Sequence, residues 1–406
     1  MAATTIGWAE ASAVGRRPRG ASRLAIPLSR IPDYGTGILA HENRDLLEAW
    51  VRGEPLGSMA LREITLDATT RCNANCLSCI DEDTREAACH TAFAIRSLLT
   101  LVRRLPELGV KIVKLYGGEP TCYRGLEQVL NALAALGVHV FMSSNGYLLH
   151  RFLCTLARLR ESVEVRVSLN AGTAETHQRI FRTRRPWFET ILANLRALSE
   201  RGVAVSASLV VRPETIGEIA RATRRVRDAG GRQMTIKPLV SPSTKTLELL
   251  PEHLKDAALG DIGEAVALQD GAFRVAVSET MHEVLAARTA EDLVQPKPAG
   301  FRCAFTAFRA VVSPPEPGVV TSCPYHRGSA SFVVGRDVAR LGAEWLASRE
   351  RQEGIERPDF QTECTFHCDR GAIALYLDAV KRRYPTEGEQ VLAEVPILPA
   401  RSGYFV

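Results

Sequence analysis

The feature that most constrains the fold of this 406-residue chain is a regular alternation between residues 61 and 240. Longer segments with helical periodicity separate six apolar, β-rich runs, which read LREITLDAT, VKIVKLYGG, VHVFMSSNG, VEVRVSLN, VAVSASLVV and QMTIKPLV. Such alternation predicts a parallel sheet with right-handed crossovers. Gly109, Gly137, Gly202 and Gly230 stand where helices should end before the next strand. The expected fold class is therefore α/β, a partial (β/α)6 barrel with its chemistry at the C-terminal ends of the strands.

The alternation stops after Val240, and four cysteines follow among Pro and Gly in residues 301–370. A cysteine-dense region with little periodicity is typical of a fold held by metal. We expect five parts: an N-terminal extension (1–60) whose first part is poorly ordered, the barrel (61–240), connecting helices (241–300), a small cysteine-rich domain (301–383) and a tail (384–406).

Composition narrows the class of protein. Hydrophobic residues make up 46% of the chain, enough for a large core, and the net charge of +5 gives no argument for a nucleic-acid partner. No run of about 18 apolar residues predicts a membrane span, and the N-terminus lacks the order of a signal peptide. We therefore expect a cytoplasmic enzyme, in which clustered cysteines are metal ligands rather than disulfides.

Three of the ten cysteines, Cys72, Cys76 and Cys79, lie in the loop RCNANCLSC directly after the first predicted strand. Thiolates suit zinc, Cu(I) and iron–sulfur clusters. A structural zinc site needs four ligands, and only three are local, although Cys89 could complete one. A [4Fe–4S] cube held by three cysteines instead leaves one iron open for a small molecule.

The C-x3-C-x2-C spacing and its position after strand one resemble the signature of the radical SAM superfamily. The resemblance covers residues 61–240. It implies that Cys72, Cys76 and Cys79 hold a [4Fe–4S] cluster whose open iron binds the amino and carboxylate groups of S-adenosylmethionine. Reductive cleavage then gives a 5′-deoxyadenosyl radical that abstracts hydrogen from the substrate. The electron would come from a flavodoxin or ferredoxin-type reductant.

Two further motifs match the family at the ends of the second and third strands. KLYGGEPT resembles its GGE motif, in which two glycines let the backbone approach the methionyl amine and the glutamate adds an acceptor. SSNG resembles the segment that ends the third strand in relatives. The cofactor-binding candidates in these motifs are Gly117, Gly118, Glu119, Pro120, Ser144 and Asn145.

The fourth strand ends in VSLNAGTAETHQRIF, where the family often has SLD. Ser168 and Asn170 are candidates to hydrogen-bond the ribose or the methionyl carboxylate, but Asn170 stands in place of the acidic residue. Arg179 or Arg182 could pair with that carboxylate through a forked contact, and the spacing does not choose between them. The candidate neighbours of the adenine are Lys237 and Pro238, which end the sixth strand.

The second cysteine set resembles the twitch and SPASM extensions of radical SAM enzymes. Cys303 and Cys323 flank Gly318 in the form C-x14-G-x4-C, and Cys364 and Cys368 follow as C-x3-C. Four cysteines fit the shorter twitch form with one auxiliary [4Fe–4S] cluster. The glycine would let the hairpin fold back so that Cys303 and Cys323 meet. The family pair is often C-x2-C, so the ligand assignment stays open.

Other ligand sets remain for this second group of cysteines. A structural zinc knuckle could use all four cysteines. His326 and His367 lie close enough in the chain to replace one of them.

The resemblance implies a radical SAM oxidoreductase. We expect it to abstract hydrogen from a polar small molecule of sugar, aminocyclitol or nucleoside type in natural-product or antibiotic biosynthesis, with the auxiliary cluster accepting an electron. An epimerase would instead need a hydrogen donor, for which Cys122 beside GGEPT is the candidate. A peptide-modifying maturase and a zinc-binding structural protein are the remaining alternatives.

Overall fold

The computed structural model describes residues 43–55, 59–80, 90–315, 317–364, 368 and 370–395. One sheet of ten strands forms its centre, in the order β10-β9-β8-β1-β2-β3-β4-β5-β6-β7. The strands are β1 (Glu63–Asp67), β2 (Ile112–Tyr116), β3 (His139–Ser144), β4 (Val163–Ser168), β5 (Ala204–Val211), β6 (Gln233–Pro238), β7 (Arg274–Val277), β8 (Arg309–Ser313), β9 (Val319–Thr321) and β10 (Val333–Gly335). Neighbours from β8 through β1 to β7 pair in parallel, and β9 and β10 are antiparallel.

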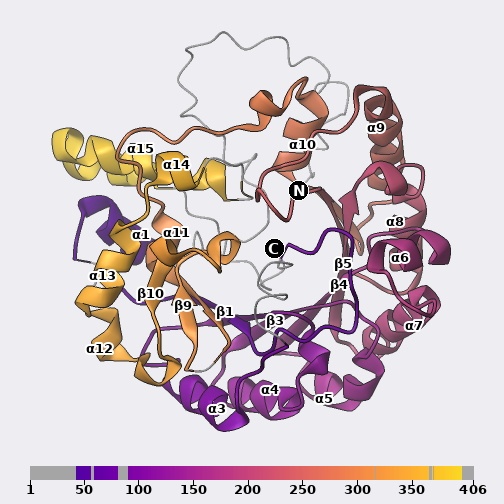
Figure 1. Ribbon diagram of the computed structural model, residues 1–406, viewed down its shortest axis with the longest axis horizontal. Coiled ribbons are helices and arrows are strands. Elements are labelled where there is room, and N and C mark those ends of the chain that lie inside the picture. The colour runs from indigo at the N-terminus through magenta and orange to yellow at the C-terminus, as the bar shows by residue number, and fades with distance from the viewer. Residues whose placement is uncertain are drawn as a thin grey trace.

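Helices cover the outer side of this curved sheet (Figure 1). Those of the barrel are α3 (Ile95–Arg104), α4 (Leu126–Ala135), α5 (Leu153–Arg158), α6 (Ala174–Phe181), α7 (Phe188–Ser199) and α8 (Ile219–Asp228), and α9 (Glu252–Val266) and α10 (Glu279–Ala286) follow. The predicted α/β fold with a partial barrel is confirmed, and β7 and β10 are the edges of the sheet. All four glycines expected to end helices have positive φ, between 66° and 81°. None of the described helices has the length and hydropathy of a membrane span.

Three features of the sheet were not expected. Strand β7 lies in the region where only helices were expected, and β8 to β10 lie in the cysteine-rich region that shows little periodicity. These strands have three to five residues, too few for a period of two to stand out. In addition, β8 pairs with β1, so the cysteine-rich region extends the barrel sheet. Helix α6 was also missed, although Thr173 caps it by accepting a hydrogen bond from the Thr176 N–H.

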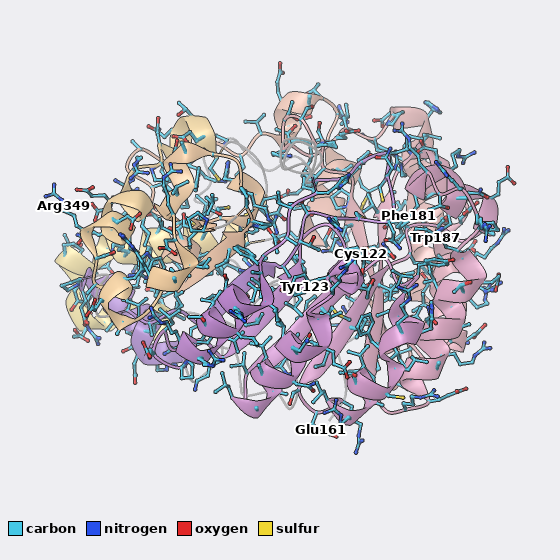
Figure 2. The ribbon with its side chains drawn as sticks, turned by 60° about the horizontal axis from the view of Figure 1, so that its bottom comes forward. Cys122, Tyr123, Glu161, Phe181, Trp187 and Arg349 are labelled. Atoms are coloured by element: carbon cyan, nitrogen blue, oxygen red, sulfur yellow. The ribbon has the colours of Figure 1, made fainter. Side chains whose placement is uncertain are left out.

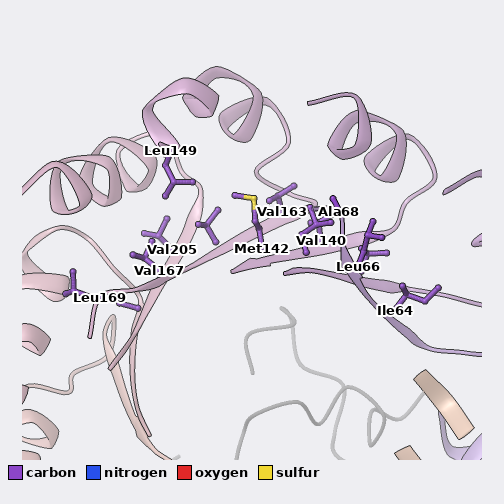
Figure 3. Close-up of a cluster of buried hydrophobic side chains, with 14 of the residues drawn as sticks. Ile64, Leu66, Ala68, Val140, Met142, Leu149, Val163, Val167, Leu169 and Val205 are labelled. Carbon is purple, nitrogen blue, oxygen red and sulfur yellow. The ribbon is translucent and has the colours of Figure 1, made fainter. Parts of the chain in front are cut away.

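Side chains along the barrel strands alternate between two environments. On β1, Ile64 and Leu66 are buried under the helices, whereas Glu63 and Thr65 line a cavity on the inner side. Figure 3 shows the outer layer, which includes Ile64, Leu66, Val140, Met142, Val163, Val167 and Val205. A parallel barrel usually fills its interior with branched apolar residues. Here the inner positions are polar, so the interior is a chamber rather than a second core.

A second core joins the two ends of the described chain. Helix α1 (Arg44–Arg52) is amphipathic and buries Leu46, Leu47, Trp50 and Val51 against the C-terminal region. That region contains α11 (Ala304–Phe308), α12 (Ala343–Leu346), α13 (Arg349–Glu356), α14 (Phe360–Glu363) and α15 (Gly371–Glu387). Lys381 of α15 lies over the Trp50 ring at 4.5 Å. Helix α1, expected in a separate N-terminal extension, therefore packs with the cysteine-rich region.

The turn after β2 holds the start of the cysteine loop. The Gly118 N–H donates to the Thr69 carbonyl at 2.9 Å, and the Glu119 N–H donates to the Arg71 carbonyl at 2.8 Å. A Cβ on Gly118 would lie 2.3 Å from the Arg71 oxygen and 2.4 Å from the Thr70 oxygen. Glycine is therefore required here because two backbone segments touch, which is a different reason from the approach of a methionyl amine.

We predict that Gly118→Ala separates the turn from the cysteine loop, because backbone atoms cannot move aside as a flexible side chain can. The expected cost is about 1–3 kcal/mol of folding free energy, together with loss of the iron held by Cys72, Cys76 and Cys79. Thermal unfolding of the apoprotein and iron analysis after anaerobic reconstitution measure both effects. Gly260→Ala on α9 is the matched control, because its Cβ would meet nothing within 4 Å. Wild-type stability and iron content in Gly118→Ala would contradict the packing argument.

Candidate active site

A cavity of about 490 Å³ occupies the inner side of the barrel. Cys72, Cys76 and Cys79 line it where the loop follows β1, and Cys368 lines it as well. Arg370, two residues after Cys368, bonds to Glu63 at 3.3 Å, and Glu63 is the first residue of β1. The first cysteine set and Cys368 of the second therefore line one cavity, near opposite ends of β1, whose five residues span roughly 13 Å at 3.3 Å per residue.

The cysteine loop is anchored from the side of α6 and from the turn after β3. The N–H groups of Asn75 and Leu77 donate to the carbonyls of Phe181 and Ile180, at 3.1 and 2.9 Å. The Asn145 side chain donates to Asn73 Oδ1 at 2.7 Å. These contacts fix the backbone between the cysteines, so the loop is shaped by two motifs that lie far from it in the sequence.

Glu119 accepts four hydrogen bonds in this region and is 1% exposed. Its Oε1 receives the Thr121 N–H, the Thr121 hydroxyl at 2.6 Å and the Ser144 hydroxyl at 2.7 Å. Its Oε2 receives the Asn145 N–H at 2.7 Å. Burial raises the pKa of Glu119, and these donors act against that rise. The carboxylate thus joins the GGEPT and SSNG turns, while both turns still line the cavity.

The remaining cofactor candidates divide between the cavity and the outer surface. Ser168 and Asn170 line the cavity, as does Lys237. Asn170 has φ of 50°, and its Oδ1 accepts the Val210 N–H at 3.0 Å, so it also holds the end of β5. Neither Arg179 nor Arg182 lines the cavity.

Phe181 explains why these two arginines lie outside the cavity. It is the last residue of α6 and turns into the cavity wall, so its helical neighbours face elsewhere. Arg182 lies in an outer groove instead. The expected forked contact with a cofactor carboxylate therefore has no support from the cavity geometry.

Charged side chains line the rest of the wall. Glu63 pairs with Lys114 at 2.7 Å and with Arg370 at 3.3 Å. Burial alone would raise the pKa of Glu63, but Arg370 and Lys114 hold it below its usual range. Burial, together with Arg370, lowers the pKa of Lys114 to about 7. The Arg327 guanidinium donates two hydrogen bonds to the Asp67 carboxylate, at 2.7 and 3.2 Å.

The cysteines of the second set come from three separate segments. Cys303 precedes α11, Cys323 follows the β8–β9 hairpin, and Cys364 and Cys368 lie between α14 and α15. Gly318 has φ of 99° in that hairpin, as its predicted fold-back role requires. Arg309 Nη2 lies 3.7 Å from Cys323 Sγ.

The thiols of both sets fit a bound cation. Burial raises the pKa of Cys303 to about 12, against the effect of Arg309, and Cys368 and Cys323 add to the rise. Burial also raises the pKa of Cys72 to about 12, with Cys79 contributing to the rise. Buried thiols that oppose one another's ionisation suit iron, which stabilises thiolates. No three His, Cys, Asp or Glu side chains of the described residues are arranged around a single metal ion, but a cubane spaces its thiolates more widely.

Three predicted residues fall outside these two sites or outside the described residues. Cys122 is half-buried at the end of the short 3-10 helix Pro120–Cys122 and lines an outer groove rather than the cavity. The alternative ligands Cys89 and His367 lie outside the described residues. His326 stacks on Phe332 with ring centres 4.0 Å apart.

The charged wall is the part of the site that motif reading missed. Lys114, Arg166 and Arg309 stand at inward positions of β2, β4 and β8. A signal was present for the first two, because both strands were expected to be buried on both faces: KIVKLY places Lys114 within an apolar run, and VEVRVS places charges at alternate positions. Arg309 carried no such signal, since β8 itself was not expected.

Comparison with known sequences identifies the barrel. Residues 66–226 match the family model described as "Radical SAM superfamily". A GTP 3′,8-cyclase of Synechocystis is 28% identical over 155 residues, which are 38% of this chain and 46% of that protein. The subtilosin biosynthesis protein AlbA of Bacillus subtilis is 26% identical over 169 residues, or 41% and 37% of the two chains. The chain thus spans about half or less of the length of these two relatives.

Solved structures share the fold at low sequence identity. Streptococcus suis SuiB bound to S-adenosylmethionine has a TM-score of 0.56 and 13% identity, over 79% of this chain and 70% of that one. Native anSMEcpe with bound AdoMet has a TM-score of 0.54 and 13% identity, over 82% and 98%. The family model, the shared fold and the cysteine loop agree that residues 66–226 of this chain form a radical SAM domain.

Proposed function

We propose that this protein is an oxidoreductase that removes hydrogen from a carbon of a polar small molecule and passes one electron to an auxiliary cluster. The observation that carries the proposal is the single cavity lined by cysteines of both sets. Radical SAM enzymes use a [4Fe–4S] cluster and S-adenosylmethionine, and Cys72, Cys76 and Cys79 are the residues to hold that cluster. Cys303, Cys323, Cys364 and Cys368 would hold the auxiliary cluster.

The cavity wall supports a polar substrate of limited size. A volume of about 490 Å³ is in the range of small-molecule sites, and the cofactor takes part of it. Thr65, Ser143 and Ser208 offer hydroxyl groups, and Arg166 offers a cationic donor. Such a wall suits a sugar, aminocyclitol or nucleoside, and we place the reaction in natural-product biosynthesis. The similarity to GTP 3′,8-cyclases, proteins named for a nucleotide, favours the nucleoside class.

Bound cluster and cofactor would supply the 5′-deoxyadenosyl radical, which takes one hydrogen atom from the substrate. Oxidation of a carbinol carbon to a carbonyl then requires the loss of one electron and one proton. Cys368 lines the cavity, so an auxiliary cluster that it helps to hold would place the electron acceptor at the wall. Lys114, whose pKa burial lowers to about 7, is the wall residue suited to take the proton. Phe181 and the turn around Glu119 line the wall beside the cysteine loop.

Peptide modification is a second candidate, which the 26% identity to the subtilosin biosynthesis protein AlbA favours. Pull-down with precursor peptides encoded near the gene separates the two candidates. A peptide that binds and is altered by the reduced enzyme would replace the small-molecule proposal.

We predict about eight iron and eight sulfide per chain after anaerobic reconstitution, because two cubanes are held by seven cysteines. Replacing Cys303 and Cys364 together by Ala should remove about four iron and leave cleavage of S-adenosylmethionine intact. Cys154→Ala is the matched control, because this exposed cysteine belongs to neither set. Iron and sulfide assays with Mössbauer spectroscopy make the measurement. About four iron with one zinc would instead indicate a zinc knuckle and remove the electron acceptor.

We also predict that Cys122→Ala turns over substrate like the wild type, because Cys122 lies outside the cavity. An epimerase that used Cys122 as hydrogen donor would stop making product while 5′-deoxyadenosine still accumulated. Turnover in heavy water is the second measurement, since a thiol exchanges its hydrogen with solvent. An oxidised product gains no deuterium at the reacting carbon in this step. A redox-neutral product carrying one deuterium would establish epimerisation instead.

A further inference from the structure

The outer side of the cysteine loop opens onto two grooves that meet at Cys72. One groove runs past Cys122 and the other past Trp187, and Cys72, Asn73 and His90 line both. Cys72 also lines the inner cavity. Figure 2 shows Cys122 and Trp187 on the face turned toward the viewer, with Arg349 far to the side. Cys72 is therefore the cluster ligand that reaches both the reaction chamber and the outer surface.

Six arginines surround this point and define what we call the arginine surface. The groove past Cys122 is lined by Arg71, Arg124 and Arg151. The groove past Trp187 is lined by Arg182, Arg184 and Arg185. All six are exposed. Neither groove has a carboxylate among its described lining residues. The described side chains that line these grooves therefore carry only positive formal charge on the outer side of the cysteine loop.

Among the described residues, no acidic side chain forms an ion pair with the six arginines of this surface. Some exposed arginines elsewhere pair with acids, as Arg225 does with Glu189 at 2.6 Å and Arg383 with Glu387, whereas others stand singly; the six are distinguished by their grouping around Cys72. The described residues offer no such acid to the six: Arg71 Nε, for example, donates to the His90 carbonyl, at 3.0 Å. Unpaired charges of one sign attract a partner of the other sign and speed its encounter.

We propose that the arginine surface is the docking site for an acidic one-electron carrier protein that reduces the radical SAM cluster. Each cleavage of S-adenosylmethionine consumes one electron, which breaks the bond between sulfur and C5′ and releases methionine. The carrier loses that electron and the cluster gains it, so no other reductant is needed. The proposal rests on the radical SAM domain and is independent of the substrate and of the auxiliary cluster.

The test uses the cleavage that occurs without substrate, measured as 5′-deoxyadenosine. The variant replaces Arg124, Arg151, Arg184 and Arg185 by Glu, which spares Arg71 beside Cys72. Arg103, Arg221, Arg224 and Arg336 replaced by Glu form the matched control, because they are also exposed and the net charge changes equally. The holoenzyme is reduced either by a fully reduced acidic flavodoxin or by dithionite.

We expect the groove variant to lose at least about tenfold in the flavodoxin-driven rate at low ionic strength, and the control to stay within about twofold of wild type. The difference should shrink at about 0.5 M salt, which screens exposed charges. Dithionite should drive both variants at the wild-type rate. Equal flavodoxin rates in the two variants would overturn the docking site. An equal loss with dithionite would also overturn it, since the arginines would then support the cysteine loop or the cofactor.

Discussion

The active site depends on one close contact between backbones, in which the turn after β2 lies directly against residues 69–71. Only glycine at 118 permits it, because any Cβ would overlap two carbonyl oxygens. The contact brings Glu119 under the cysteine loop, where its carboxylate collects donors from two turns. Breaking any one of these hydrogen bonds would leave a buried polar group unsatisfied. The GGEPT motif thus holds the chain's own scaffold together, in addition to the cofactor contact that the family resemblance implies.

Much of the barrel could be predicted because its strands are long enough to show their pattern and its helices end at glycine. The cysteine loop could be located because its spacing is specific and it follows a strand. The C-terminal strands could not be predicted, because strands of three to five residues are too short to show a period of two. In addition, the barrel strand β1, with which β8 pairs, is remote in sequence. The ion pair between Arg327 and Asp67 could not be predicted for the same reason, because the two residues are remote in sequence and nothing in the residues around either one points to the other.

Motif matching placed residues correctly but often explained them by the wrong contact. Ser144 and Asn145 line the cavity as expected, yet their side chains donate hydrogen bonds to Glu119 and to Asn73 of the cysteine loop. Asn170, which replaces an expected acid, uses its side chain to complete the end of β5. An amide can both occupy the left-handed region and accept a backbone N–H, which accounts for the substitution locally. Arg179 and Arg182 show that spacing alone cannot orient a side chain on a helix that had not been anticipated.

The pairing of β8 with β1 has a consequence for how the protein reaches its native state. Ser313, at the end of β8, bonds to Asp67, at the end of β1, across 246 residues of chain. Contacts of such long range form late, because the loop must close before they contribute. During synthesis the barrel strands can assemble before β8 has been made, so that one edge of β1 is still unpaired. An open edge of this kind invites pairing with other chains. Truncation after residue 300 should therefore lower the yield of folded protein more than it would if the C-terminal region were a separate domain that folded independently of the barrel.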